Sequence, residues 1–430
     1  MSTLKRAIGL PSATALVVGT IIGSSIFVQA SEIALLVRHP GAILLAWAVA
    51  GLLTLIGALV CAELSSAYPK TGGVYVFLKE IYSPSLGFLW GWAMLWTMHS
   101  GILAAIATVF ARYAGVFLPL DDVTTRAVAI TAIVTLSLIN YLGVKFGSRV
   151  QAGFTLVKVL AVVAIIALGW FFYEPSLHHF GTIATPLPSI GSFFLAVGAG
   201  LFAFGGWHMV TYTAEETVNP TRTIPRSLMI GVAIVTLCYI GLNVVYLRVL
   251  PLETIMKSTR VAADTFEVVF GTQAAGAISA LVMFSAFGAL NGIVLVGPRV
   301  YYQMSQDGLW FKWASHLHPT FQTPGRAIVL QGVVASVLVA TGSYRALFTR
   351  VIYTEWIFFA LLAFGVILLR RRPGYAPAWR MPLVPLAPLL FVIVSLLIVV
   401  NQIRADLTNS AIGLAIVASG LPAYYFWNRK

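Results

Sequence analysis

Charged residues and cysteines are both scarce in this chain of 430 residues. Only 10% of the residues are charged, while 59% are hydrophobic, which excludes a soluble globular protein and leaves no room for a sizeable soluble domain. The two cysteines, Cys61 and Cys238, both fall inside apolar runs, so they supply neither a disulfide framework nor a metal cluster. The composition therefore predicts an all-α polytopic membrane protein, with no cofactor and no metal.

Apolar runs long enough to cross a bilayer recur along the whole chain. A transmembrane helix needs about 20 residues, and on that criterion about twelve spans are expected. The first run is too long for the core of a signal peptide and has no small-residue cleavage site after it, so we interpret it as a true span. The expected spans cover approximately residues 10–37, 41–67, 84–118, 124–142, 148–173, 189–217, 227–250, 271–304, 327–341, 347–369, 383–401 and 410–426.

The placement of the basic residues predicts the orientation. With the N-terminus inside, 17 of the 27 lysines and arginines fall on the cytoplasmic side and 9 outside, with Lys158 left within a span. Because cytoplasmic loops carry the excess of lysine and arginine, both termini are predicted to be cytoplasmic. The net charge of +13 is thus explained by topology in a cell inner or plasma membrane, and we expect no nucleic-acid partner.

Two of the spans are interrupted by glycine near their middle. The first interruption lies in residues 19–27, Gly-Thr-Ile-Ile-Gly-Ser-Ser-Ile-Phe, and the second in residues 198–207, which contain Gly205-Gly206. Such a matched pair in two halves of a chain is a pointer to a midplane binding site between repeats, although glycine and serine also allow close helix packing. Because five spans separate the breaks, we predict a 5+5 inverted repeat: helices 1–5 in residues 1–173, helices 6–10 in 189–372, and two extra C-terminal helices in 383–430.

The chemistry of a broken helix indicates what the breaks could hold. The second half of the first span begins near Ser24 and Ser25, where free N–H groups and the positive end of the helix dipole favour a carboxylate. The first half ends near Ile21, and the outer half of the sixth span ends near Phe202, which leaves carbonyls that suit an ammonium group. A carboxylate and an ammonium group held close together are the two charged groups on the α-carbon of an amino acid. The sequence shows only that such a site would suit an amino acid, not that one binds.

These stretches are specific enough to resemble a known family. Residues 19–27 resemble the first-helix signature of the amino acid–polyamine–organocation (APC) superfamily. The sixth span resembles the sixth-helix signature of the L-type amino acid transporter (LAT) branch of this superfamily. We therefore expect the chain to be a prokaryotic member of that branch. Its supporting motifs are Phe202-Ala203-Phe204-Gly205-Gly206-Trp207, Glu215-Glu216, Asn219-Pro220, Ala62-Glu63-Leu64, Pro69-Lys70-Thr71-Gly72-Gly73, residues 235–239 with Asn243, and Asn291-Gly292 through Arg299.

The resemblance implies roles for individual residues. Amides at Ser24, Ser25 and Ile26 hold the substrate carboxylate, carbonyls at Ile21, Phe202 and Gly205 take the amino group, and the Phe202 ring acts as a gate. The expected substrate-binding set is completed by Gly23, Gly206, Trp207 and His208. The sequence departs from the family at Ser25, where glycine is usual, and at His208, where many animal members carry asparagine; both departures put side-chain preference in question.

Lys158 is the lone basic residue within a span, and a charge at that depth is a functional hypothesis by default. The L-type branch has a lysine here, where sodium-coupled relatives bind their ion. A tethered ammonium could replace that cation and tie span one to span eight, could carry a proton, or could be purely structural. Tyr239 matches a second family position, near the other sodium site, although a tyrosine in a span is more often a packing residue.

Glu355 is the unexpected charged residue, in the tenth span, where animal L-type members tend to have a neutral asparagine beside the substrate. Helix rise places it about 10 Å from Lys158 along the membrane normal, which argues against a simple ion pair. We consider a structural, hydrogen-bonded carboxyl first and a pocket or proton site second. His99 and His208 lack the partners of a metal site, and Trp90, Trp92 and Trp96 are typical of an interfacial belt.

The sequence therefore favours a carrier that moves neutral L-amino acids by alternating access, with sodium-independent exchange first and proton-coupled symport second. An ion channel or a membrane enzyme is the alternative from another class, but no filter-like loop or cluster of acid–base groups supports it. The expected partners are small amino acid substrates and the lipid bilayer. Animal L-type members join a heavy chain through a cysteine between spans three and four; residues 119–125 contain none, so no disulfide-linked heavy chain is expected.

Overall fold

The computed structural model describes residues 4–23, 25–171, 187–258, 260–342 and 353–428. Within these residues the secondary structure is helical, apart from one isolated parallel bridge between Ile8 and Thr217. The first half contains α1 (Leu10–Ile21), α2 (Ser25–Val37), α3 (Pro40–Ala67), α4 (Val74–Ile81), α5 (Pro84–Ala93), the π-helical turn η1 (Met94–Met98), α6 (His99–Ala114), α7 (Asp122–Tyr141) and α8 (Val144–Phe171).

The second half and the C-terminal region are helical as well. They contain α9 (Ile190–Ala203), the 3₁₀ segment η2 (Trp207–Glu216), α10 (Pro220–Val249), α11 (Leu252–Lys257), α12 (Val261–Phe270), α13 (Thr272–Val296), α14 (Pro298–Gln306), η3 (Lys312–Ser315), α15 (Gly325–Thr341), α17 (Thr354–Leu369), α18 (Leu386–Ala405), α19 (Leu407–Ala418) and α20 (Gly420–Asn428).

The lengths of these helices confirm an all-α polytopic membrane fold. Nine helical segments in the described part of the chain are long and apolar enough to cross a membrane. The broken pair α1–α2 and the shorter apolar helices α15 and α17 correspond to the remaining expected spans. Two details differ from expectation: residues 271–304 are divided between α13 and α14 at Pro298, and the short helices α11 and α12 precede them.

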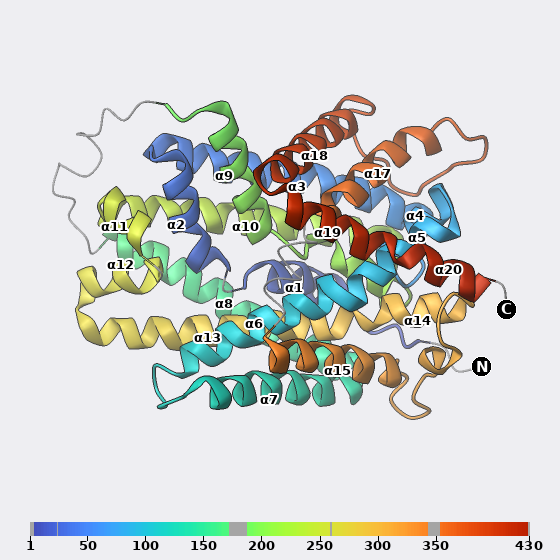
Figure 1. The fold of residues 1–430 in the computed structure, drawn as a ribbon, viewed down its shortest axis with the longest axis horizontal. Helices are drawn as coiled ribbons and strands as arrows, with labels where there is room; N and C mark the ends of the chain where they lie inside the picture. Colours follow the sequence, from blue (N-terminus) through green and yellow to red (C-terminus); the bar gives the residue numbers. More distant parts are fainter. Residues whose placement is uncertain (1–3, 24, 172–186, 259, 343–352, 429–430) are drawn as a thin grey trace.

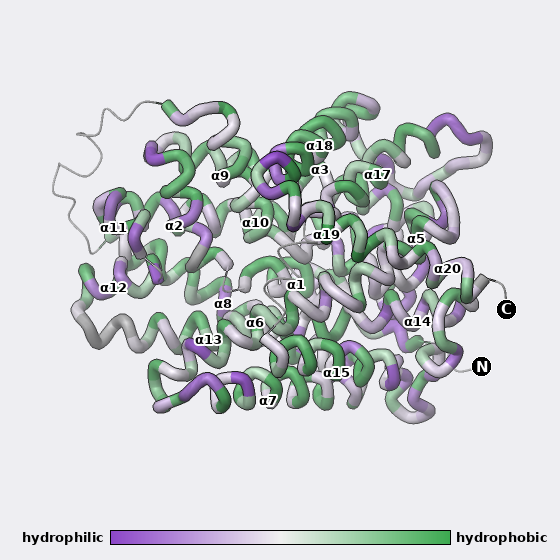
Figure 2. The backbone as a smooth tube through the Cα atoms, viewed as in Figure 1, coloured by the Kyte–Doolittle hydropathy of each residue, from purple (hydrophilic) through white to green (hydrophobic). Residues whose placement is uncertain are grey.

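Helix α1 occupies the middle of the bundle (Figure 1) and packs against α8, α10 and α13. Hydrophobic residues dominate the peripheral helices α7, α15 and α18, whereas hydrophilic residues are concentrated towards the two ends of the molecule (Figure 2). The described ends of the chain lie at one and the same end of the bundle (Figure 1). The central position of α1 places any irregularity in it within protein rather than lipid, which is where broken backbone is tolerated.

Both predicted helix breaks are present. Helix α1 ends at Ile21, Ile22 has extended backbone (ψ 91°), and α2 starts at Ser25. Helix α9 ends at Ala203, and η2 begins after Gly206, whose φ of +98° is a left-handed conformation that favours glycine. Ser24, one of the predicted site residues, lies outside the described residues.

The tryptophan belt expected at the start of the third span is wrong for Trp90. Its side chain is fully buried in the protein, with its ring 5.4 Å from that of Phe358. Trp96, by contrast, is 40% exposed on the outer surface, as a belt residue would be. Hydropathy does not separate these cases, because an interfacial and a core-facing tryptophan occur in equally apolar sequence.

Candidate functional site

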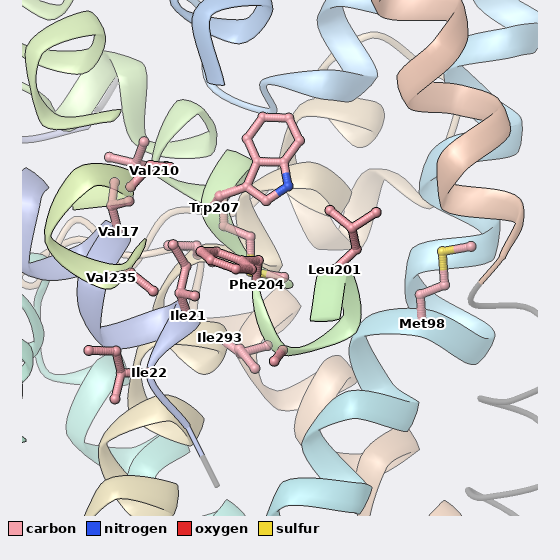
Figure 3. Packing of buried hydrophobic residues seen from close by; sticks show 14 of the residues in the cluster. Val17, Ile21, Ile22, Met98, Leu201, Phe204, Trp207, Val210, Val235 and Ile293 are labelled. Atoms are coloured by element: carbon pink, nitrogen blue, oxygen red, sulfur yellow. The ribbon is translucent and has the colours of Figure 1, made fainter. Parts of the chain in front are cut away.

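The two helix breaks lie against each other. The Thr20 hydroxyl donates to the Gly206 carbonyl oxygen at 3.3 Å, in addition to carbonyls of its own helix. A Cβ atom at Gly206 would lie 3.2 Å from the Thr20 carbonyl oxygen, so the backbones approach as closely as glycine permits. Figure 3 shows Ile21 of α1 beside Phe204, which follows α9. The structure thus unites two breaks that are far apart in the sequence.

Tyr239 of α10 joins the ends of the two broken helices. Its hydroxyl oxygen lies 3.0 Å from the Ile21 carbonyl oxygen and 3.0 Å from that of Ala203. The Tyr239 phenol thus ties the end of α1 to the end of α9.

Lys158 of α8 binds the end of α1. Its Nζ atom donates to the carbonyl oxygens of Gly19, at 3.1 Å, and Ile22, at 2.8 Å, and the side chain is 1% exposed. None of the ion pairs among the described residues involves Lys158, so its charge faces the carbonyl end of α1. The ammonium thus binds two carbonyl oxygens where α1 ends.

Helix α13 closes the other side of this lysine. Ser285 donates to the carbonyl oxygen of Gly23 at 3.2 Å, and a Cβ atom at Gly288 would lie 3.1 Å from the Nζ atom of Lys158. Lys158 therefore links span one and span eight: it forms hydrogen bonds with α1 and packs closely against α13.

Three further predicted site residues lie at the breaks: Phe202 and Trp207 at the second and Ile26 at the first. Phe202 is 38% exposed, and its carbonyl oxygen accepts the Gly205 N–H at 3.1 Å. Trp207 is buried, with its ring 5.1 Å from that of Phe359. Ile26 is fully buried at the start of α2.

His208 follows the second break in η2, whereas Glu355 lies on α17. His208 is 1% exposed, and its two ring nitrogens have no hydrogen-bond partner. Glu355, in the first turn of α17, is 7% exposed, and its Oε1 atom also has no partner. The structural, hydrogen-bonded carboxyl expected here therefore has no hydrogen bond at Oε1 and stays a prediction. No ion pair with Lys158 occurs among the described residues.

Sequence reasoning missed two residues beside His208. Tyr212 of η2 and Trp90 of α5 are fully buried, with rings 5.6 Å and 5.7 Å from that of His208. The helix that carries Trp90 continues into the π-helical turn η1, a feature found frequently at functional sites. Neither an isolated tyrosine nor a tryptophan in an apolar run carries a signal that would have found them.

The geometry suits a small zwitterion better than a metal or a reacting centre. The described residues include no group of three or more histidine, cysteine, aspartate or glutamate side chains that could hold a metal ion. The breaks instead offer a helix N-terminus at Ser25 and carbonyl oxygens at Ile21 and Phe202. Such groups bind a carboxylate and an ammonium group respectively.

Comparison with known proteins agrees with this geometry. The profile of a family described as amino acid permease matches residues 8–421. The chain is 32% identical to the serine/threonine exchanger SteT of Bacillus subtilis (strain 168), over 99% of this chain and 98% of that protein. It is 31% identical to the human b(0,+)-type amino acid transporter 1, over 99% of this chain and 88% of that protein.

A further relative is the human large neutral amino acids transporter small subunit 2. It is 30% identical to this chain, over 99% of this chain and 82% of its own length. These matches cover nearly the whole chain, including both helix breaks, and they make the protein a transporter rather than an enzyme. The chain belongs to the amino acid permease family, within the APC superfamily, and is similar to its L-type branch.

Proposed function

We propose that this protein exchanges neutral L-amino acids across the membrane by alternating access, without sodium. The observation that carries the proposal is the Lys158 ammonium, which is bound by the carbonyl oxygens of Gly19 and Ile22 at the end of α1. A fixed cation at that position makes a dissolved one unnecessary. The relatives named as exchangers and neutral amino acid transporters support the same function.

In this proposal the substrate carboxylate binds the N–H groups at the start of α2, around Ser24, Ser25 and Ile26. The amino group binds the carbonyl oxygens of Ile21, Phe202 and Gly205, and the partly exposed Phe202 ring gates the site. Gly23 and Gly206 allow the close backbone approach. Trp207 and His208 border the end of the site that receives the substrate side chain. Residues 1–173 and 189–372 act as inverted repeats, with 383–430 as an appendage.

The orientation in the membrane and the expected partners are also inferred from the sequence. Both termini are proposed to be cytoplasmic, in the cell inner or plasma membrane, because the basic residues are concentrated on that side. The protein acts without a disulfide-linked heavy chain, because Cys61 and Cys238 are buried.

Uptake into proteoliposomes tests the mechanism. We expect radiolabelled alanine or leucine to enter only vesicles that contain unlabelled amino acid. The binding site of an exchanger faces the outside again only after it has bound an amino acid from the inside. Replacement of sodium by potassium should leave the rate unchanged. Equal uptake into empty vesicles under an imposed pH gradient would instead establish proton-coupled symport.

Substitution of Gly206 by alanine tests the contact between the breaks. We expect Gly206→Ala to lower the exchange rate at least about tenfold, because a left-handed alanine is strained by about 1–2 kcal/mol and its Cβ would press on Thr20. Gly198→Ala is the matched control: Gly198 is helical, and its nearest neighbour would lie 3.9 Å away. Equal rates in the two variants would show that the close approach at Gly206 is dispensable.

A further inference from the structure

A cavity opens on the side of the bundle where α6, α7 and α13 pack together. Its volume is about 220 Å³. Helix α7 lies at the edge of the bundle (Figure 1), and its residues Thr131 and Thr135 are exposed, so the cavity is open to the surroundings of the protein. We call this cavity the notch; it is lined by Phe110 of α6, Val128, Thr131, Ala132 and Thr135 of α7, and Phe287 of α13.

The notch lies at the depth of the hydrocarbon core of a membrane. Helix α7 begins at Asp122, next to the exposed capping residue Asp121. With a helix rise of about 1.5 Å per residue, Val128 and Thr135 lie about 9 Å and 20 Å from that end. The hydrocarbon core is about 30 Å thick, so the lining falls within it. The notch is therefore surrounded by lipid rather than by water.

The surface around the notch is apolar. On α7, Val134 is 48% exposed and Leu138 is 62% exposed, and on the neighbouring helix α15 Val337 is 53% exposed. The lining itself contains no charged side chain. The Thr131 hydroxyl donates to the Ala127 carbonyl oxygen at 2.8 Å, so this donor is satisfied within its own helix. The notch is thus continuous with the lipid-facing surface and has no group that would hold a charged ligand.

The acyl chain of a membrane lipid suits such a space. An empty gap beside packed side chains loses dispersion contacts on one side. A water molecule needs about two to four polar partners, whereas the lining offers two hydroxyl groups, one of which is already bonded to its own helix. An acyl chain is aliphatic, flexible and present at this depth, so it restores the contacts without burying a polar group.

The floor of the notch leads towards Lys158. The ring of Phe287 lies 5.3 Å from that of Phe110 and 5.7 Å from that of Phe154 on α8. Phe154 is one helical turn from Lys158, on the same face of α8. The residue after Phe287 is Gly288, where a Cβ atom would lie 2.8 Å from the Phe154 Cβ and 3.1 Å from the Lys158 Nζ. The backbone of α13 therefore has little free space between the notch and the lysine.

We propose that the notch binds the acyl chain of a membrane lipid, and that this chain supports Phe287 and so holds α13 against Lys158. The proposal assigns a lipid site that recognises an aliphatic chain rather than a head group. It goes beyond amino acid exchange and does not depend on it, because it rests on packing alone. A failure of counterflow would therefore leave the outcomes below unchanged.

Photo-crosslinking tests the site. The probe is phosphatidylcholine with a diazirine in the middle of one acyl chain, in proteoliposomes that contain the full chain, and the adducts are mapped by mass spectrometry. We expect adducts at Phe110 and Phe287 to form at least about fivefold more often than at Val337, which is exposed on α15 outside the lining. Equal labelling of the three positions, or no lipid adduct at Phe287, would overturn the proposal.

A substitution that fills the notch is the second test. Thr131→Phe should lower the yield of adducts at Phe287 at least about threefold, because the new ring takes the place of the chain. Val134→Phe is the matched control, since Val134 is also exposed on α7 but is not part of the lining. An equal decrease in the two variants would contradict the assignment to the notch. If the variants fail to fold, the labelling of the unmodified protein still decides.

Hydrogen–deuterium exchange tests the support of α13. In detergent, added phosphatidylcholine should slow the exchange of peptides that contain Phe287 and Gly288 at least about threefold in the unmodified protein, because local opening becomes rarer. The same lipid should have little effect on these peptides in Thr131→Phe, where the notch is already filled. Equal protection in both proteins, or none in either, would overturn the proposed support of α13.

Discussion

Replacement of Lys158 by alanine is expected to abolish exchange, with a fall of at least about a hundredfold in the rate of counterflow. The substitution removes the ammonium donor from the buried carbonyl oxygens of Gly19 and Ile22, and the Ile22 oxygen keeps only the Ser285 hydroxyl, at 3.4 Å. A buried acceptor that loses its donor costs about 1–3 kcal/mol. The substitution also removes the cation that faces the carbonyl end of α1. The measurement is initial counterflow of radiolabelled alanine, normalised to the folded protein that elutes as a single species in detergent.

A small cation should rescue this variant if the ammonium acts as a replacement ion. We expect added ammonium or sodium to restore a measurable part of the rate in Lys158→Ala but to leave Lys158→Met unrescued, because its side chain fills the space. Lys145→Ala is the matched control, since Lys145 is exposed on the same helix. Unchanged kinetics in Lys158→Ala would remove the case for an ion substitute.

The second large effect is a loss of stability, which we expect from substitutions at the end of the bundle where the described termini lie. Arg299 of α14 and Glu216 at the end of η2 form a bidentate ion pair, with 2.8 Å between Nη2 and Oε1. Both side chains are almost fully buried, and Arg299 also donates to the Leu295 carbonyl oxygen. The Glu216 carbonyl oxygen accepts the N–H groups of Ala7 and Ile8, which fixes the N-terminal segment here.

Removal of one partner is expected to destabilise the protein by about 3–5 kcal/mol, because the other charge stays buried and unpaired. Thermal unfolding in detergent should therefore place Glu216→Gln and Arg299→Met well below the unmodified protein. The double variant Glu216→Leu/Arg299→Met should recover much of the loss, since it leaves no buried charge.

The Lys79–Asp307 pair is the comparison for this experiment. Its charged atoms are similarly close, at 2.7 Å, but the two side chains are 19% and 21% exposed. Loss of a solvent-accessible pair costs about 0–1 kcal/mol, so Lys79→Met should unfold near the temperature of the unmodified protein. A similar fall in Lys79→Met and Arg299→Met would contradict the argument from burial.

The amino-acid sequence by itself determined the helices, their interruptions and the family. Span length depends only on a run of apolar residues, and the breaks at Gly23 and Gly205-Gly206 depend on local backbone conformation, so both could be predicted. Lys158 could be singled out because an isolated charge in a span is conspicuous.

Only the tertiary structure decided which groups meet. The phenol of Tyr239 joins carbonyls at Ile21 and Ala203, and no pattern in the sequence encodes a contact across so many residues. Trp90 was misassigned to the membrane interface because composition does not record which face of a helix meets protein and which meets lipid. The same limit hid the neighbours of His208: the rings of Trp90 and Phe359, which come from distant spans, lie 5.7 Å and 4.9 Å from that of His208.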